Sequence, residues 1–334
     1  ISQQLDGSYC RFVARKFYNF VNFRHQKLLS TVLTYLLFVA GFIILIKGAA
    51  WLVDGSASVA RRFGISEIVV GLTIVSMGTS TPELVVSVFS SLKGNPEIVV
   101  GNVVGSNIVN ILFILGLSAV IFPLTVKKNT TYKEIPFALL SALIIMIMGG
   151  DTLFDFENSA VVTTGDGLVL LGFFAIFMYY IFAIAKQEPV PGNKAEVLPL
   201  WKSVVMITLG LIALVFGGRW IVDGATEIAM QFGVSNSLIG LTIVAIGTSL
   251  PELATSVMAS LKGERDIAVG NILGSNIFNI GAVLGLSSLV APDGLPVAHS
   301  SLMTDIPVMI LVALICLPVF LANYIITRLD GVTF

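Results

Sequence analysis

The stretch Gly78-Thr79-Ser80-Thr81-Pro82-Glu83 lies within the apolar run 68–92 and predicts a membrane helix with a break in it. Pro82 removes a backbone donor and displaces the carbonyl of Gly78, while Thr81 before it is disfavoured in helical geometry. The exposed carbonyls are tolerated at membrane depth only where protein or a water-filled cavity covers them. Glu83 adds an ionised group that costs at least roughly 2.5–3.5 kcal/mol at a helix centre. Carbonyls, hydroxyls and a carboxylate are hard oxygen ligands, so together they indicate a Ca²⁺ or Na⁺ site.

The same pattern occurs again 169 residues later, as Gly247-Thr248-Ser249-Leu250-Pro251-Glu252. Residues 51–123 align with residues 220–292 without a gap, and 40 of the 73 aligned positions are identical. This is an internal duplication. Proline-interrupted segments at matching places in two halves are typical of the binding site of a transporter.

Composition places the chain in the membrane. It has 334 residues, of which 56% are hydrophobic and 12% are charged, and its mean hydropathy is +0.95. Such values are typical of a polytopic helical membrane protein. The sequence contains no basic face or motif for nucleic-acid binding. Its two cysteines, Cys10 and Cys316, are far apart, and we expect no structural disulfide.

The apolar spans divide the chain into two halves. We expect the first half at residues 32–186, a cytoplasmic linker at 187–202 and the second half at 203–334. Residues 1–31 are basic and aromatic, and they favour either an amphipathic helix at the membrane interface or a poorly ordered tail. The nine expected spans are residues 33–53, 65–92, 97–122, 135–150, 166–185, 203–222, 237–261, 267–291 and 304–327.

Symmetry predicts a tenth span, because the first half has five spans and the second half has four. Asp166-Gly167 opens the fifth span, and Asp330-Gly331 stands where the tenth would begin. We therefore expect about 20 apolar residues beyond Phe334, the length that crosses the hydrocarbon core.

The charges of the short loops predict the orientation, since cytoplasmic loops are rich in lysine and arginine. Eleven such residues fall on one side under strict alternation, and only Lys93 falls on the other. Because each half has five spans, the two halves have opposite orientations, and the N-terminus lies outside. We expect a multi-pass protein of the plasma (inner) membrane. The eleven residues are Arg61, Arg62, Lys127, Lys128, Lys133, Lys186, Lys194, Lys202, Lys262, Arg265 and Arg328.

A second duplicated motif follows each Pro-Glu break. It reads Gly-Asn-x-x-Gly-Ser-Asn-x-x-Asn at residues 101–110 and again at 270–279. Ser106 and Asn110 are four residues apart and share one helix face, as do Ser275 and Asn279. Their oxygens therefore join the predicted site.

Structural roles for these residues are the alternative. The glycines of the second motif could let two helices pack closely. Thr79 and Ser80 could bond back to the preceding turn, and Glu83 could be a protonated carboxyl held inside the bundle. Two copies of each motif at matching places favour a shared ion site.

These paired motifs resemble the α-repeats of the Ca²⁺/cation antiporter superfamily, and most closely those of prokaryotic Na⁺/Ca²⁺ exchangers. The resemblance covers about residues 33–334. It implies an all-α polytopic fold with two inverted-topology repeats of five transmembrane helices, in which helices 2 and 7 are discontinuous. It also implies that Glu83 and Glu252 are the central carboxylates, that Thr79 and Thr248 supply backbone carbonyls to Ca²⁺, that Ser80, Ser106, Ser249 and Ser275 line Na⁺ sites, and that Asn110 and Asn279 complete the middle.

One position departs from part of that family. Some relatives, including K⁺-dependent members, carry aspartate where this chain has Asn279. The asparagine argues against K⁺ co-transport and leaves the central site with one fewer possible charge.

The function expected from these features is exchange of Ca²⁺ for Na⁺ by alternating access. Two carboxylates balance one Ca²⁺, and several Na⁺ ions would compete for the same ligands. The nearest alternative is Ca²⁺/H⁺ exchange through the same glutamates. A cation channel fits the twofold repeat less well, and an enzyme lacks a nucleophile–base pair or a His/Cys metal cluster in the sequence. We expect no cofactor; the partners are Ca²⁺, Na⁺ and the lipid bilayer, and the protein should function as a monomer.

Overall fold

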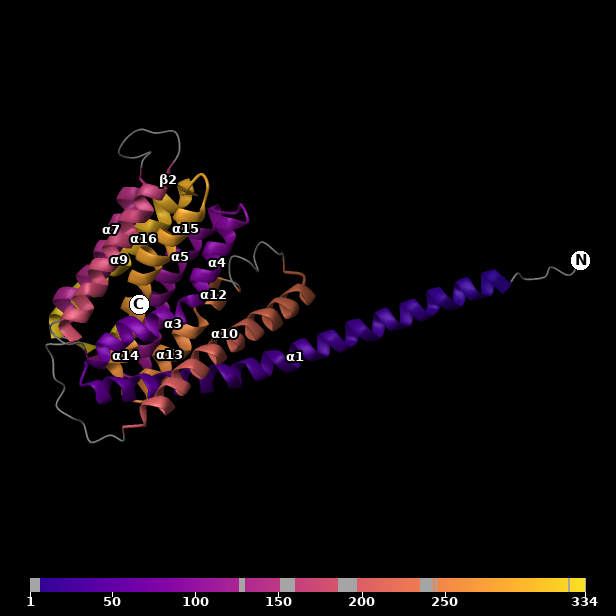
Figure 1. Ribbon diagram of the computed structural model, residues 1–334, viewed down its shortest axis with the longest axis horizontal. Coiled ribbons are helices and arrows are strands. Elements are labelled where there is room, and N and C mark those ends of the chain that lie inside the picture. The colour runs from indigo at the N-terminus through magenta and orange to yellow at the C-terminus, as the bar shows by residue number, and fades with distance from the viewer. Residues whose placement is uncertain are drawn as a thin grey trace, which may run out of the picture.

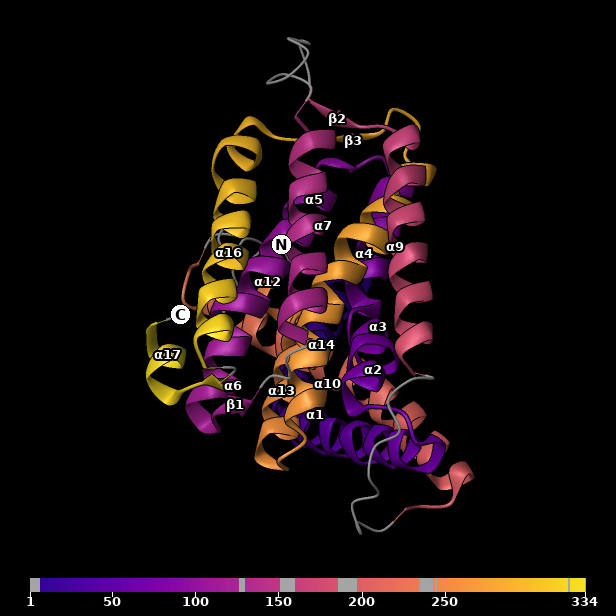
Figure 2. The ribbon, with the colours of Figure 1, turned by 90° about the vertical axis from the view of Figure 1, so that its left-hand side faces the viewer.

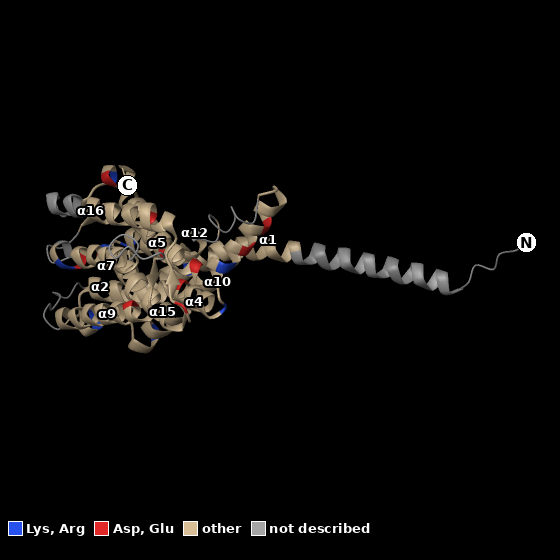
Figure 3. Ribbon diagram, turned by 90° about the horizontal axis from the view of Figure 1, so that it is seen from above, with Lys and Arg blue, Asp and Glu red and all other residues tan. Residues whose placement is uncertain are grey.

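The computed structural model describes residues 7–125, 130–150, 160–185, 197–234, 243, 245–323 and 325–333. They form a helical bundle with two very short strand pairs (Figures 1 and 2). Five helices are long and apolar enough to cross a membrane, and a bent helix pair makes a sixth. These six account for the predicted spans except 135–150, 237–261 and 304–327, where the described residues form shorter helices. Figure 3 shows how sparse charged residues are over the bundle.

The elements of the first half follow the predicted order. They are α1 (Gly7–Phe63), α2 (Glu67–Val70), the π turn η1 (Gly71–Val75), α3 (Ser76–Thr79), α4 (Thr81–Leu92), α5 (Glu97–Val109), the π turn η2 (Asn110–Leu115), α6 (Gly116–Ile121), β1 (Leu124–Thr125), the π turn η3 (Thr130–Glu134), α7 (Ile135–Met148), β2 (Val161–Val162) and α9 (Thr164–Ala185).

The second half contains the equivalent elements. They are α10 (Leu200–Gln231), α12 (Ala245–Thr248), α13 (Leu250–Leu261), α14 (Arg265–Phe278), the π turn η5 (Asn279–Leu284), α15 (Gly285–Val290), β3 (Leu295–Pro296), the π turn η6 (Ser301–Asp305), α16 (Ile306–Asn323), β4 (Ile325–Ile326) and α17 (Arg328–Thr333). Residues 237–242 and 244 of the seventh predicted span lie outside the described residues.

Three predicted boundaries are wrong. The first and sixth spans were expected to end near residues 53 and 222, but α1 and α10 continue to Phe63 and Gln231. Both helices end before a glycine with a positive φ, Gly64 (64°) or Gly233 (77°), and such a residue closes a helix whatever the polarity of the preceding turns. The ninth span was expected to reach residue 327, but α16 ends at Asn323 and β4 follows.

The expected break in the second span lies at Ser80. The segments Glu67–Thr79 and Thr81–Leu92 are bent by 45° relative to each other. Ser80 has φ −84° and ψ 9°, and its counterpart Ser249 has φ −87° and ψ 4°. Pro82 and Pro251 stand in the first turns of α4 and α13, where a missing backbone donor costs little. The proline therefore starts the second segment of each span.

Equivalent first helices of the two halves, α1 and α10, pack side by side at the foot of the bundle (Figures 1 and 2). A methyl group built on Gly41 would lie 2.9 Å from the carbonyl oxygen of Gly217, and one on Gly48 would lie 2.9 Å from that of Gly210. Residue numbers rise along one helix as they fall along the other, so the two helices are antiparallel. The glycines let their backbones approach closely.

Two short ribbons, which the all-helical expectation did not include, join the halves. Strand β1 of the first half pairs antiparallel with β4 of the second, and β2 of the first pairs with β3 of the second. The two ribbons lie at opposite ends of the bundle (Figure 2). The helices after β2 and β4 start alike, because Asp166 accepts hydrogen bonds from Thr163 (2.7 and 2.8 Å) and Asp330 accepts the same two from Thr327.

An ion-pair cluster also connects the halves near the end of α1. The Arg61 guanidinium contacts the carboxylate of Glu67 at 3.2 Å and also that of Glu264, just before α14. Lys262 at the end of α13 contacts Asp54 of α1 at 2.5 Å. These ion pairs connect the C-terminal part of α1 to the second half.

Candidate cation-binding site

The two glutamates of the duplicated motif meet inside the bundle. Glu83 lies in the first turn of α4 and Glu252 in the first turn of α13, and each is only 1% exposed. Ser80, three residues before Glu83, bonds to the carboxylate of Glu252, so the two glutamates lie in the same region of the interior. Each also benefits from the positive end of its helix dipole. A compact pair of buried negative charges of this kind needs a cation or protons as a counterpart.

Hydroxyl groups of each half reach the carboxylate of the other. Ser80 donates a hydrogen bond to Oε1 of Glu252 at 2.7 Å. The Thr248 hydroxyl is near the carboxylate of Glu83, and the Thr79 hydroxyl is near that of Glu252, which Ser275 approaches from its own half. The site is therefore built from both halves at once.

Several oxygens of the predicted ligands are buried and accept no hydrogen bond from the described residues. Unpaired buried polar atoms cost free energy, so a cluster of them indicates a missing partner. Every one is a carboxylate, hydroxyl or amide oxygen, the donor set that suits Ca²⁺ and Na⁺. They are Oε1 and Oε2 of Glu83, Oε2 of Glu252, Oγ of Ser106 and Ser249, and Oδ1 of Asn110 and Asn279.

The elements explain why these residues converge. Thr79 and Ser80 flank the break between α3 and α4, and Thr248 and Ser249 flank the equivalent break between α12 and α13. Asn110 and Asn279 are the first residues of the π turns η2 and η5, and Ser106 and Ser275 precede them by one turn. Irregular backbone of both kinds is frequent at functional sites.

The structural alternatives raised by the sequence are resolved differently for each residue. The Thr79 hydroxyl does bond back to the carbonyl of Ser76 (3.2 Å), and it also contacts Oδ1 of Asn271 (3.0 Å). The Ser80 hydroxyl instead bonds to Glu252. Close packing of the motif glycines is real in the second half, where a methyl group on Gly270 would lie 2.8 Å from the carbonyl oxygen of Ile68. The second motif therefore contributes to helix packing as well as to the candidate site.

Some buried polar residues beside the site were missed by the sequence reasoning. Asn271 donates to the backbone carbonyl of Glu252 (3.3 Å) and to the hydroxyl of Ser256 (2.9 Å). Asn107 and Asn276 form further hydrogen bonds at the centre of the bundle. All except Ser256 belong to the second motif, so their recurrence in both copies was a signal that could have found them.

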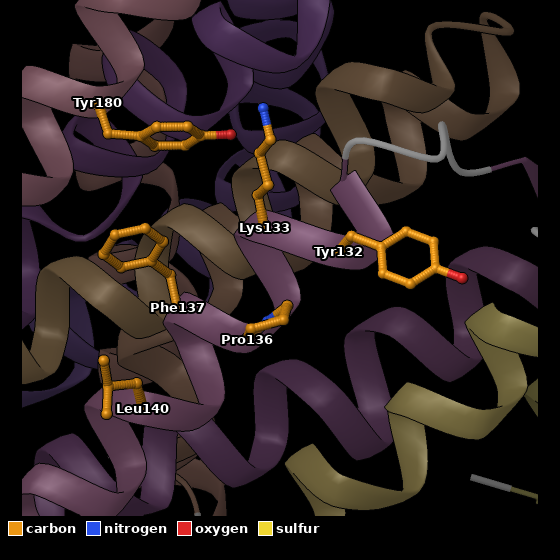
Figure 4. A pocket seen from close by; sticks show the side chains of 6 residues that line it. All are labelled: Tyr132, Lys133, Pro136, Phe137, Leu140 and Tyr180. Carbon is orange, nitrogen blue, oxygen red and sulfur yellow. The ribbon is translucent and has the colours of Figure 1, made fainter.

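Several surface hollows among the described residues lie away from the predicted ligands. The largest one described, about 390 Å³, opens between α7 and α9 and is lined by Phe137, Leu140, Tyr180 and three neighbours (Figure 4). None of the ten predicted ligands lines a hollow described here.

Comparison with known proteins gives consistent results. The family model described as sodium/calcium exchanger protein matches residues 33–183 and 202–334. The inner membrane protein YrbG of Escherichia coli (strain K12) is 39% identical over 292 residues, covering 84% of this chain and 86% of its own. The sodium/calcium exchanger MaX1 of Methanosarcina acetivorans is 32% identical over 333 residues, covering 89% and 94%. A solved structure of the sodium-calcium exchanger NCX_Mj, soaked with 2.5 mM Na⁺ and 0.1 mM Ca²⁺, is 34% identical and superposes with a TM-score of 0.77 over 90% of this chain and 95% of that one.

Proposed function

Because the chain belongs to the sodium/calcium exchanger family, within the Ca²⁺/cation antiporter superfamily, we propose that it exchanges Ca²⁺ for Na⁺ across the membrane by alternating access. It is an integral multi-pass membrane protein of a transporter family. The observation that carries the proposal is the buried cluster of unpaired oxygens around Glu83 and Glu252.

The chemistry of that cluster explains exchange. Two carboxylates provide a charge of about −2, which one Ca²⁺ neutralises in a low-dielectric interior. Serine and asparagine oxygens around them can complete the shells of Na⁺ ions that compete for the same carboxylates. Since neither ion leaves the buried carboxylates unpaired, either loaded form can rearrange, whereas the empty form carries uncompensated charge.

An inverted repeat supplies a route for the rearrangement. The antiparallel packing of α1 and α10 and the ribbons at opposite ends of the bundle support it. In such folds the two halves exchange conformations around a fixed site. We propose that this protein does so in the plasma membrane as a monomer, with its N-terminus outside and with helices 2 and 7 discontinuous at Ser80 and Ser249.

Transport in proteoliposomes tests the coupling ion. We expect uptake of ⁴⁵Ca²⁺ when the vesicles are loaded with Na⁺ and diluted into Na⁺-free medium, and no uptake with a K⁺ gradient. A pH gradient alone should not drive it. If a pH gradient drives full Ca²⁺ transport and Na⁺ has no effect, the protein is a Ca²⁺/H⁺ exchanger, and the serine and asparagine oxygens have another role.

A further inference from the structure

Two buried asparagines at the centre of the molecule are not among the proposed ion ligands. Asn107 of α5 and Asn276 of α14 are 1% and 3% exposed and occupy equivalent positions of the two repeats. The amide nitrogen of Asn107 donates to the backbone carbonyl of Asn276 at 3.1 Å, and the amide nitrogen of Asn276 donates to that of Asn107 at 3.3 Å. Because the contact is reciprocal between equivalent residues, it lies where a twofold axis would relate the halves.

The reciprocal contact fixes which way both amides point. A backbone carbonyl can only accept a hydrogen bond, and a side-chain amide can donate only from its nitrogen. The Nδ2 atom of each asparagine must therefore face the partner's carbonyl. Its Oδ1 atom then faces the opposite direction as a pure acceptor.

That acceptor meets a proposed ligand from the other half. Oδ1 of Asn107 accepts a hydrogen bond from Nδ2 of Asn279 at 3.0 Å, and Oδ1 of Asn276 accepts one from Nδ2 of Asn110 at 2.9 Å. Each ligand asparagine thus uses its nitrogen. Its own Oδ1 atom stays buried without a hydrogen-bond donor among the described residues.

We propose that Asn107 and Asn276 are positioning residues that hold the amide oxygens of Asn279 and Asn110 toward the transported cation. The inference rests on the proposed function, because it assigns those two oxygens to the cation shell. If the amide of Asn279 were reversed, its Oδ1 atom would face Oδ1 of Asn107, and two acceptors would oppose each other. Its N–H₂ group would then point toward the positive ion. The chain of acceptor, donor and acceptor excludes that arrangement in both halves.

A double-mutant cycle on purified full-length protein tests this role. We would measure ⁴⁵Ca²⁺ binding at equilibrium for Asn107→Ala, Asn279→Ala and the double variant. Loss of an outer hydrogen-bond partner typically weakens metal binding about 10- to 100-fold, so Asn107→Ala should weaken Ca²⁺ binding about tenfold. The double variant should bind no more weakly than Asn279→Ala, because no ligand oxygen is left to orient.

Controls separate positioning from general stability. Asn95 is exposed in the loop before α5. Asn95→Ala should leave Ca²⁺ binding unchanged, while thermal unfolding in Ca²⁺-free buffer reports stability for every variant. Asn107→Ser replaces the alanine variant if the latter is not recovered folded. The equivalent cycle on Asn276 and Asn110 gives an independent measurement.

Two results would overturn the assignment: unchanged Ca²⁺ affinity in folded Asn107→Ala, or multiplication of the two single effects in the double variant. Multiplication of the two effects would mean that Asn107 acts independently of Asn279 and has a purely structural role. Failure of the proposed function gives a different pattern, because the unmodified protein would then bind no Ca²⁺ or Glu252→Gln would bind it normally.

Discussion

At the scale of single residues, the duplication made most of the candidate site predictable. Identical side chains at positions 169 apart indicated Glu83, Glu252 and their neighbours as a set, and the structure brings them together. The two carboxylates nevertheless differ in detail, since Ser80 bonds to Glu252 whereas neither oxygen of Glu83 accepts a bond from the described residues. The sequence could not predict this, or the roles of Asn107 and Asn276. The partner of each hydrogen-bond donor lies in the other half, so it depends on how the two halves pack together and not on the neighbouring sequence.

Removing either carboxylate charge should nearly abolish Ca²⁺ exchange. Leaving one partner of a buried charge pair uncompensated costs about 3–5 kcal/mol, which is at least about a hundredfold in affinity. We expect Glu83→Gln and Glu252→Gln to lose ⁴⁵Ca²⁺ flux in proteoliposomes. The exposed Glu97 provides the control, and Glu97→Gln should transport normally. Near-normal flux in either site variant would refute the assignment of the carboxylates.

The serines should affect Na⁺ more than Ca²⁺. Ser106 has a buried Oγ atom without a hydrogen-bond partner among the described residues, and the Ser275 hydroxyl makes a long contact of 3.5 Å to the carbonyl of Ser76. We expect Ser106→Ala and Ser275→Ala to raise the Na⁺ concentration needed for half-maximal Ca²⁺ release while changing Ca²⁺ binding less. Ser141→Ala is the control, because that buried serine bonds to the carbonyl of Ala138 and is not among the proposed ligands. Equal loss for both ions would argue against separate Na⁺ positions.

At the scale of elements, periodicity and proline placed the helices but not their interruptions. The break was expected between Gly78 and Pro82 and lies at Ser80. The π turns at Asn110 and Asn279 were not expected, because an extra residue in a turn shows only as a shift of the polar face. The span Arg265–Val290 is buried all round and has no such face to shift. The strand pairs escaped notice because two residues are too few for an alternating pattern.

The glycine contact between α1 and α10 allows a matched test of close packing. A methyl group on Gly48 would lie 2.8 Å from Cβ of Ala213, whereas one on Gly172 of α9 meets no described atom within 4 Å. Overpacking costs about 1–3 kcal/mol, while alanine in an open helix position gains about 0.5–1 kcal/mol over glycine. Gly48→Ala should therefore lower the thermal unfolding midpoint in detergent, and Gly172→Ala should leave it unchanged or raise it. A Gly48→Ala midpoint equal to that of the unmodified protein would mean that the helices separate easily.

At the scale of the whole molecule, the sequence predicts the relation between the halves from charge alone. Eleven lysines and arginines of the loops fall on one side of the membrane and one falls on the other. Because the first half has an odd number of spans, five, the second half is expected to start from the opposite side. In the described residues, α1 and α10 are antiparallel, and the two ribbons lie at opposite ends of the bundle. Loop charges cannot, however, predict which surfaces hold the halves together. Those surfaces are glycine contacts, strand pairs and asparagine hydrogen bonds, each of which needs residues from both halves.

Two equivalent lysines test the inversion directly. Lys93 follows α4 and Lys262 follows α13, 169 residues apart. In a background without Cys10 and Cys316, we expect Lys93→Cys to react with a membrane-impermeant maleimide on intact cells. Lys262→Cys should react only after the membrane is permeabilised. Reaction of both from the same side would show that the halves are parallel.

The strand pairing between halves has a consequence for how the protein is made. When the first half leaves the ribosome, β1 and β2 have no partners, because β4 and β3 have not yet been translated. The same holds for the glycine face of α1 and for the amide of Asn107. The nascent first half therefore remains in the bilayer with its polar centre incomplete until β3 and β4 of the second half have been translated. The strand pairs, glycine contacts and asparagine hydrogen bonds between the halves therefore form only when both halves are present.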